Sequence, residues 1–293
     1  MKTLIKVILI ALILTPICAH AEDKNIDVFE YLMRSTFKIQ GENSFGTAFV
    51  MGMPAPTTSR AACYVLITAT HVLKSIKSDH ATIFLRKKVG ENYEKYPYEF
   101  KIRDQGKPMW INHDDVDVAA IMLPIPDDAE FPLISTELLA TDEMLHQYEV
   151  HPGDQLFVLG YPYGAEANEA GFPILRSGRI ASFPLSPTSQ YKTFLLDFEV
   201  FAGNSGGPVL FYSENRLIND KVKYNKVQFI MGVVSLELSK NEEVSSLTEK
   251  VVRKLKLSLA VIAQARFVND LIEEISYSLE STSKIYQPPG GQE

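Results

Sequence analysis

The chain of 293 residues has only two cysteines, Cys18 and Cys63. If Cys18 is removed with an N-terminal leader, no intrachain disulfide can form. Small secreted animal domains usually depend on such bridges, because their cores are too small to stabilise them. A chain of this length can bury a substantial core in one large or two small domains. We therefore expect a fold that is held by its core.

Long apolar runs are also scarce, and the clearest one stands at the start. The first residues, "MKTLIKVILIALILTPICAHAED", carry two lysines, an uncharged run and then Ala19-His20-Ala21. This order is typical of a secretory signal peptide, here residues 1–21. The run is shorter than the roughly 20 apolar residues that span a bilayer, so we expect no stable membrane insertion after cleavage. A lipoprotein signal through Cys18 is the weaker alternative, because Ile17 is bulky. The sequence predicts export to a bacterial periplasm or secretion.

Basic residues are also fewer than acidic ones, 29 against 36. The formal net charge is −7, and it becomes −9 when Lys2 and Lys6 leave with the signal peptide. An acidic protein is repelled by phosphates, so nucleic acid is not expected as a partner. The sequence holds no H-E-x-x-H motif. We expect neither a metal nor a cofactor.

Short β-rich runs recur along the chain at near-regular spacing. Each is closed by Gly, Pro, Asn or Asp, a pattern that indicates a β-barrel or a β-sandwich. The runs are "TFKIQG", "GTAFVMG", "CYVLITAT", "ATIFLR", "YEFKIRD", "DVAAIMLP", "DQLFVLGYP", "TFLLDFEV", "PVLFY" and "VQFIMGVVS".

One long helix is predicted near the C-terminus, in "AQARFVNDLIEEISYSL". Its apolar residues recur at helical spacing, which indicates an amphipathic helix packed on a sheet. They are Phe267, Val268, Leu271, Ile272 and Ile275. The final "STSKIYQPPGGQE" has no periodicity and is predicted to be disordered.

The stretch "FAGNSGGPVL" places Ser205 among glycines. A serine becomes a nucleophile only when a base takes its proton and a third group orients that base. All six histidines precede Ser205. The α/β-hydrolase elbow G-x-S-x-G is therefore excluded, because its histidine must follow the serine. A subtilisin-like order has little support, since few acidic residues precede His71.

The remaining order is histidine, aspartate, serine. His71 follows the apolar run "YVLITAT", and Asp117 begins the run "DVAAIMLP". Each also has an ordinary explanation, as a surface histidine or a turn aspartate. From the residues alone, Asp114, Asp115 and Asp117 remain alternatives for the carboxylate.

Taken together, "TATH", "DVA" and "GNSGGP" resemble the trypsin-like serine peptidases of the chymotrypsin fold, in particular the disulfide-free bacterial branch related to HtrA proteases. Further similarity lies in "GTAFVM", "GDQLFVLGYPYG", "ILRSGRIAS" and "MGVVS", so the resemblance covers most of residues 36–235. It implies an all-β protein of two six-stranded antiparallel β-barrels with a C-terminal α-helix.

The resemblance also implies boundaries. The peptidase domain would span 22–280, with an N-terminal barrel at about 34–125, a linker at about 126–150 and a C-terminal barrel at about 151–262. The helix would take about 263–279 and the disordered tail 281–293. Too little chain follows Leu279 for a PDZ domain, so substrates would be recruited by the protease surface itself.

Roles follow from the resemblance residue by residue. His71 would be the general base, Asp117 its orienting partner and Ser205 the nucleophile, and the family pattern of Asp, aliphatic, Ala selects Asp117. The backbone N–H groups of Gly203 and Ser205 would form the oxyanion hole. Asn204 stands where digestive relatives have Asp, so activation by an N-terminal salt bridge is not expected. Because the base must be neutral, activity should fall in acid.

The resemblance assigns the substrate pocket to Glu199, Ser235, Leu236 and Glu237. Two carboxylates there would favour a basic substrate residue, or both would point to solvent. The expected function is that of an exported serine endopeptidase acting on protein or peptide substrates through an acyl-enzyme. The alternative is a non-catalytic or latent protease-fold module for binding or chaperone-like work.

Overall fold

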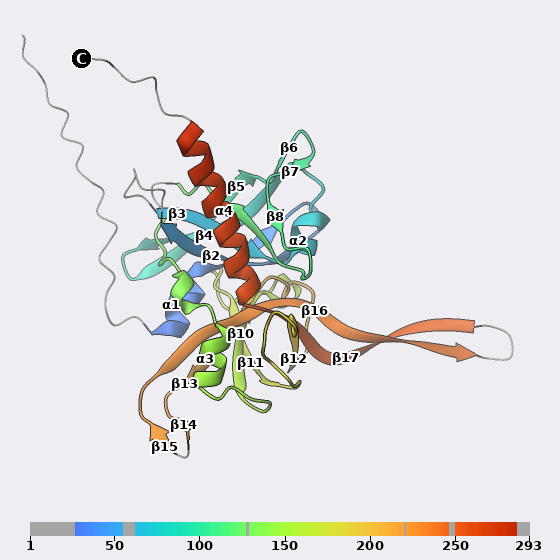
Figure 1. The fold of residues 1–293 in the computed structure, drawn as a ribbon. Coiled ribbons are helices and arrows are strands. Elements are labelled where there is room, and N and C mark those ends of the chain that lie inside the picture. The colour runs from blue at the N-terminus through green and yellow to red at the C-terminus, as the bar shows by residue number, and fades with distance from the viewer. Residues whose placement is uncertain (1–26, 55–61, 127–128, 220, 246–249, 286–293) are drawn as a thin grey trace, which may run out of the picture.

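In a computed structural model the structure describes residues 27–54, 62–126, 129–219, 221–245 and 250–285. Two strand-rich lobes follow one another, and a long helix runs from the second lobe along the first (Figure 1). Each predicted strand run overlaps a strand. The predicted signal peptide, residues 1–21, lies outside the described residues.

The N-terminal lobe is built around one antiparallel seven-stranded sheet with the order β5-β4-β1-β2-β3-β9-β8. Within the described residues, no pairing joins β5 to β8, so the second closed six-stranded barrel is not confirmed. β6 and β7 form a separate two-stranded sheet. The strands are β1 (Thr36–Gln40), β2 (Phe45–Pro54), β3 (Ala62–Thr68), β4 (His80–Val89), β5 (Asn92–Lys101), β6 (Arg103–Asp104), β7 (Lys107–Pro108), β8 (Ile111–Asn112) and β9 (Ala119–Met122).

The central strands of this sheet are buried on both faces. Along β2, Ala48 and Val50 belong to a core inside the lobe, whereas Phe49 and Met51 belong to a core shared with the second lobe. Successive side chains of a strand point to opposite faces, so the continuous apolar run "AFVM" supplies both cores. The two lobes therefore pack against each other through the outer face of this sheet.

The C-terminal lobe is a closed six-stranded barrel with the order β10-β11-β12-β17-β16-β13, as expected for one of the two barrels. β14 and β15 form a small hairpin beside it. The strands are β10 (Gln155–Gly160), β11 (Ile174–Ile180), β12 (Thr193–Asp197), β13 (Pro208–Ser213), β14 (Arg216–Ile218), β15 (Lys221–Lys223), β16 (Val227–Ser245) and β17 (Lys250–Gln264).

The hairpin of β16 and β17 continues well beyond the barrel as a two-stranded arm (Figure 1). Its pairing runs from the barrel out to Ser245, which faces Lys250. β17 has no counterpart among the predicted strand runs, because it begins in the lysine-rich "KVVRKLKL", and lysine is depleted in strands. Pairing with β12 and β16 determines its conformation instead.

Helix α4 (Arg266–Ile285) buries the predicted stripe, including Phe267, Leu271 and Ile275. It extends beyond the predicted end at about 279, so residues 281–285 are helical and not part of a disordered tail. The physical reason is that no glycine or proline interrupts the chain before Pro288. Residues 286–293 lie outside the described residues.

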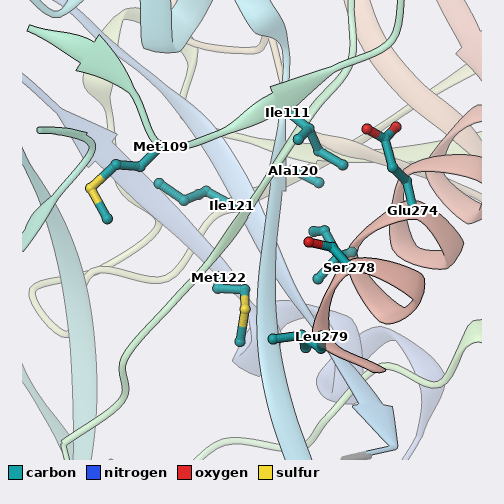
Figure 2. Close-up of a pocket in the computed structure, with 9 residues that line it drawn as sticks. Met109, Ile111, Ala120, Ile121, Met122, Glu274, Ser278 and Leu279 are labelled. Carbon is teal, nitrogen blue, oxygen red and sulfur yellow. The ribbon is translucent and has the colours of Figure 1, made fainter. Parts of the chain in front are cut away.

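A cavity of about 220 Å³ lies between α4 and the strands β8 and β9 (Figure 2). Met109, Met122 and Leu279 line its apolar wall, and Glu274 lies at its helical side. Within the part of the chain that the structure describes, no helix is both long and apolar enough to cross a membrane.

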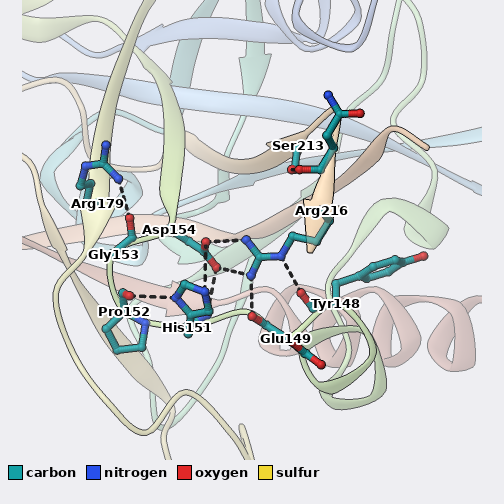
Figure 3. A network of polar contacts seen from close by, with 10 residues as sticks. Tyr148, Glu149, His151, Pro152, Gly153, Asp154, Arg179, Ser213 and Arg216 are labelled. Carbon is teal, nitrogen blue, oxygen red and sulfur yellow. Dashed lines mark hydrogen bonds and ion pairs between the residues drawn. The ribbon is translucent and has the colours of Figure 1, made fainter. Parts of the chain in front are cut away.

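The predicted linker contains short ordered elements, the 3-10 turn η1 (Thr136–Leu138) and helix α3 (Asp142–Gln147). Its end is fixed to the barrel by the Arg216 guanidinium, which donates to both carboxylate oxygens of Asp154 at 2.5 and 2.7 Å and to the carbonyl of Tyr148 at 2.8 Å (Figure 3). The bidentate pair joins β14 to the turn before β10, and the bond to Tyr148 holds the end of the linker against the same arginine.

Helix α1 (Val28–Ser35) precedes the first strand and was not predicted. The Asp27 side chain accepts a hydrogen bond from the N–H of Phe29, which caps the helix. Val28 and Leu32 are buried in the core that the two lobes share. The remaining short helices are α2 (Thr70–Ser75) and the 3-10 turn η2 (Pro162–Gly164).

Candidate active site

The segment around Ser205 consists of two consecutive tight turns. The N–H of Asn204 donates to the carbonyl of Phe201, and the N–H of Gly207 donates to the carbonyl of Asn204, each at 3.0 Å. The third residue of each turn is a glycine with positive φ, Gly203 at 97° and Gly206 at 88°. A type II turn requires that conformation at its third position, and glycine adopts it without steric cost. The glycines of "GNSGG" are thus required by the backbone.

Side chains are excluded at both glycines for a second reason. A Cβ on Gly203 would lie 2.1 Å from the carbonyl oxygen of Tyr161, and a Cβ on Gly206 would lie 2.0 Å from that of Thr47. Within the described part of the chain, the N–H groups of Gly203 and Ser205 have no hydrogen-bond acceptor. Two free amides on one tight loop are the arrangement that binds a developing oxyanion.

The carbonyls of this loop are held from outside. The N–H of Tyr163 donates to the carbonyl of Ala202 at 2.6 Å, and the hydroxyl of Thr47 donates to the carbonyl of Gly203 at 2.6 Å. In a trans peptide the C=O and N–H point in opposite directions. The N–H of Tyr163 therefore fixes the peptide group between Ala202 and Gly203. The N–H of Gly203 points away from the backbone of Tyr163 as a result.

His71 lies in the first turn of α2, because β3 ends at Thr68, two residues before the end of the predicted run "CYVLITAT". The cap residue Ala69 has no side chain that can accept the free N–H groups of this turn. Asp117 does so instead: its Oδ1 accepts the N–H of His71 at 3.0 Å, while its Oδ2 lies 2.6 Å from Nδ1 of the same residue. One carboxylate thus caps the helix and orients the imidazole.

The choice among the three aspartates is resolved by these contacts. Asp115 pairs with Lys192 at 2.7 Å and Asp114 is exposed, whereas Asp117 is half-buried beside His71. Burial raises the pKa of the Asp117 carboxyl, but the hydrogen bonds and charge of His71, with the hydroxyl of Ser235, outweigh it and hold that pKa below its usual range. Asp117 is therefore ionised at neutral pH.

Ser235 connects the two halves of the site. Its hydroxyl donates to Asp117 Oδ2 at 3.0 Å, and its carbonyl accepts the hydroxyl of Ser205 at 3.1 Å. The Ser205 hydroxyl thus points to Ser235 and not to the imidazole. Transfer of its proton to His71 requires the hydroxyl to turn away from the carbonyl of Ser235.

The family of the chain follows from a comparison with known domains. The model described as a trypsin-like peptidase domain matches residues 46–218, which include the predicted histidine, aspartate and serine. The chain belongs to the trypsin-like peptidase domain family. No curated protein matches the chain in sequence.

Among solved structures, the domain is similar to Rv3671c of M. tuberculosis H37Rv, described as an inactive form that carries a serine-to-alanine mutation. The sequence identity is 19%, the TM-score is 0.44, and the match covers 91% of this chain and 94% of that one.

Of the predicted pocket residues of this trypsin-like domain, only Ser235 forms hydrogen bonds with the predicted triad, namely with Asp117 and Ser205. Leu236 is 52% exposed and Glu199 is exposed. Glu237 matches neither alternative from the sequence, a carboxylate free to attract a basic substrate residue or one that points to solvent. Its side chain is only 12% exposed and forms an ion pair with Lys256 at 2.6 Å. Neither of the two described cavities includes a triad residue.

Three site residues escaped the sequence analysis: Thr47 and Tyr163, which hold the loop carbonyls, and Lys256. Thr47 lies in "GTAFVM", which marked a resemblance without a role. Tyr163 acts through its backbone, and its positive φ of 53° has no signature in a tyrosine. Lys256 reaches the site only through the pairing of β16 with β17.

Proposed function

We propose that this protein is an exported serine endopeptidase that cleaves peptide bonds through an acyl-enzyme. The observation that carries the proposal is the Asp117 carboxylate, which holds both the ring and the backbone of His71 beside the serine loop. Two free backbone amides on that loop would stabilise the negative charge that develops on the substrate oxygen. Export is proposed from the signal-like residues 1–21.

In the proposed mechanism the Ser205 hydroxyl attacks the carbonyl carbon of the scissile bond while Nε2 of His71 takes its proton. The oxygen of the tetrahedral intermediate receives hydrogen bonds from the N–H groups of Gly203 and Ser205. Collapse breaks the C–N bond, and the imidazolium gives its proton to the leaving amine. Water then attacks the acyl-enzyme by the same proton transfers in reverse order, which releases the acid product and restores Ser205.

Asp117 serves this mechanism without taking the proton. As an anion it keeps the Nδ1 proton of His71 on its own side, so that Nε2 is the basic nitrogen. It also stabilises the imidazolium that forms after proton transfer. The hydroxyl of Ser235 stabilises the same anion, which makes Ser235 a positioning residue.

A latent form is the second candidate, and one observation favours it. The Ser205 hydroxyl donates to the carbonyl of Ser235, an orientation from which it cannot give its proton to His71. The catalytic hydrogen bond from a serine to its histidine often forms or tightens only when substrate is bound. A latent protein would keep the loop geometry and gain activity when a partner or substrate turns the serine.

A fluorophosphonate probe tests the proposal, because it reacts covalently with activated serines. We expect labelling of the wild type at neutral pH and none of Ser205→Ala. The matched control is Ser213→Ala on β13, whose hydroxyl donates only to the carbonyl of Asn215, and which should label like the wild type.

Absence of labelling in the folded wild type, also after addition of a protein substrate, would contradict the catalytic proposal. Labelling only after that addition would support the latent form.

A further inference from the structure

A charged cluster lies beside the nucleophile loop, on strand β16. Ser235 contacts both Asp117 and Ser205, and Glu237 follows two residues later, about 7 Å along the strand at 3.3 Å per residue. Ser235 and Glu237 are turned inward, whereas Leu236 between them is exposed. Glu237 therefore lies within reach of a substrate side chain next to the scissile bond.

The partner of Glu237 comes from the base of the arm. The backbone of Lys256 faces Ser239, and the register between β16 and β17 shifts between Glu237 and Ser239. This shift allows the Lys256 ammonium to reach back to Glu237 Oε2 at 2.6 Å. Lys256 is well exposed, so the ion pair stands where the strand meets solvent.

One acceptor of the cluster is left unused. Glu237 Oε1 is buried, and no hydrogen-bond partner for it exists in the described part of the chain. A buried carboxylate oxygen without a donor carries a desolvation cost. The ion pair with Lys256 is therefore the interaction that balances the charge of Glu237.

The other carboxylate near this ion pair, that of Glu199, has little influence on its charge balance. The Glu199 side chain is exposed, and its carbonyl accepts the guanidinium of Arg176 at 2.9 Å. That guanidinium stacks on the rings of Phe198 and Phe201. The hydrogen bond and charge of Glu237 raise the pKa of the Lys256 ammonium, with smaller contributions from Tyr163 and Glu199, so Lys256 stays charged.

We propose that Lys256 is a specificity-determining residue of the peptidase, which cancels the charge of Glu237 so that the enzyme accepts uncharged residues beside the scissile bond. The inference rests on the proposed function and deepens it. Without Lys256, Glu237 would become an unopposed carboxylate and would attract Lys or Arg in the substrate. Without Glu237, Lys256 would attract Asp or Glu.

The experiment compares Lys256→Met, which keeps the apolar stem, with the wild type on a peptide library read by mass spectrometry. We expect Lys256→Met to raise the kcat/KM for peptides with Lys or Arg next to the cleaved bond about tenfold relative to alanine peptides. Glu237→Gln should shift preference in the opposite direction, and the double variant should return to the neutral profile. Lys221→Met on the exposed β15 changes the net charge equally and should leave the profile unchanged.

The outcomes separate this inference from the proposed function. Unchanged profiles in active Lys256→Met and Glu237→Gln overturn the inference and leave the function standing. If Lys256→Met is inactive, the profile of Glu237→Gln decides. Loss of cleavage in both variants with labelling at Ser205 retained also overturns it, because the pair is then needed to cleave any peptide and not to choose among them. Absence of labelling in the wild type contradicts the proposed function instead.

Discussion

At the scale of single residues, Asp117 illustrates how one carboxylate performs two tasks. A six-residue helix whose cap residue is alanine leaves its first N–H groups without a partner, and Asp117 accepts one of them. The same group lies against Nδ1 of His71. The position of the imidazole is therefore fixed through its backbone as well as through its ring. A side chain held at two points loses less entropy when it reacts.

Ser235→Ala tests the hydroxyl that supports Asp117. The variant removes one hydrogen bond to the carboxylate, and we expect kcat to fall about tenfold, which corresponds to about 1.4 kcal/mol. Because the Ser235 hydrogen bond lowers the pKa of Asp117, that pKa should rise, and the acid limb of the pH profile should move to higher pH. Steady-state kinetics against pH measures both.

Ser177→Ala on the exposed side of β11 is the control for this substitution. A Ser235→Ala variant with an unchanged kcat and an unmoved acid limb would show that the hydroxyl has no positioning role.

At the scale of elements, the site is assembled from parts of both lobes. The N–H of Thr47 on β2 donates to the carbonyl of Ser205 at 2.9 Å, so a strand of the first lobe holds the nucleophile loop of the second. β16 holds the loop from the other side, since the N–H of Gly206 donates to the carbonyl of Val234 at 2.7 Å and the N–H of Val234 donates to the carbonyl of Gly207 at 2.9 Å. The elements that carry the site are thus also those that join the lobes.

Helix α4 offers a stability test at this scale. Leu271 is fully buried in the core that the lobes share, so Leu271→Ala should lower the free energy of unfolding by about 2–4 kcal/mol through lost burial and a residual cavity. Tyr277 on the same helix is 77% exposed, and Tyr277→Ala should change stability by less than about 0.5 kcal/mol. Urea unfolding measures both. Equal effects would mean that α4 contributes no core packing.

At the scale of the whole molecule, charged groups cross between the lobes. Glu166 of the second lobe forms short ion pairs with Lys38 and Lys95 of the first. The Arg86 guanidinium is almost fully buried and donates to the carbonyls of Thr36 and Gly171 at 2.7 and 2.9 Å. Burial lowers the pKa of Arg86, and the carbonyls compensate its desolvation.

Glu166 gives the molecule an acid-sensitive contact. Burial raises the pKa of this carboxyl, but the hydrogen bonds and charges of Lys38 and Lys95 outweigh it and lower the pKa below the usual range. A lowered folded-state pKa contributes stability above the unfolded-state pKa, and this is lost as the pH falls through the folded-state value. The free energy of unfolding should therefore fall below about pH 4.5 more steeply in the wild type than in Glu166→Gln.

Denaturant unfolding between pH 3 and 7 measures this difference. Glu91→Gln removes an exposed carboxylate of the first lobe and should keep the wild-type slope. Identical pH dependence in Glu166→Gln and wild type would exclude a role for this contact in acid stability.

The amino-acid sequence by itself determined the β-rich class, the strand runs, the amphipathic helix and the identity of the glycine turns. Each of these depends on local periodicity or on backbone freedom, such as the positive φ at Gly203. The position of all six histidines before Ser205 also excluded the α/β-hydrolase fold. What local pattern could not decide was which aspartate meets His71.

Only the tertiary structure decided the contacts between distant segments. It placed Asp117, the aspartate that the resemblance implied, against His71, added Thr47 and Tyr163 as supports of the loop, and brought Lys256 to Glu237 through a register shift. It also showed one seven-stranded N-terminal sheet, whose closure into the expected second barrel is not confirmed among the described residues. The physical reason is common to all of them: strand pairing and lobe packing join residues that are far apart in the chain, and no local pattern encodes the register of those pairings.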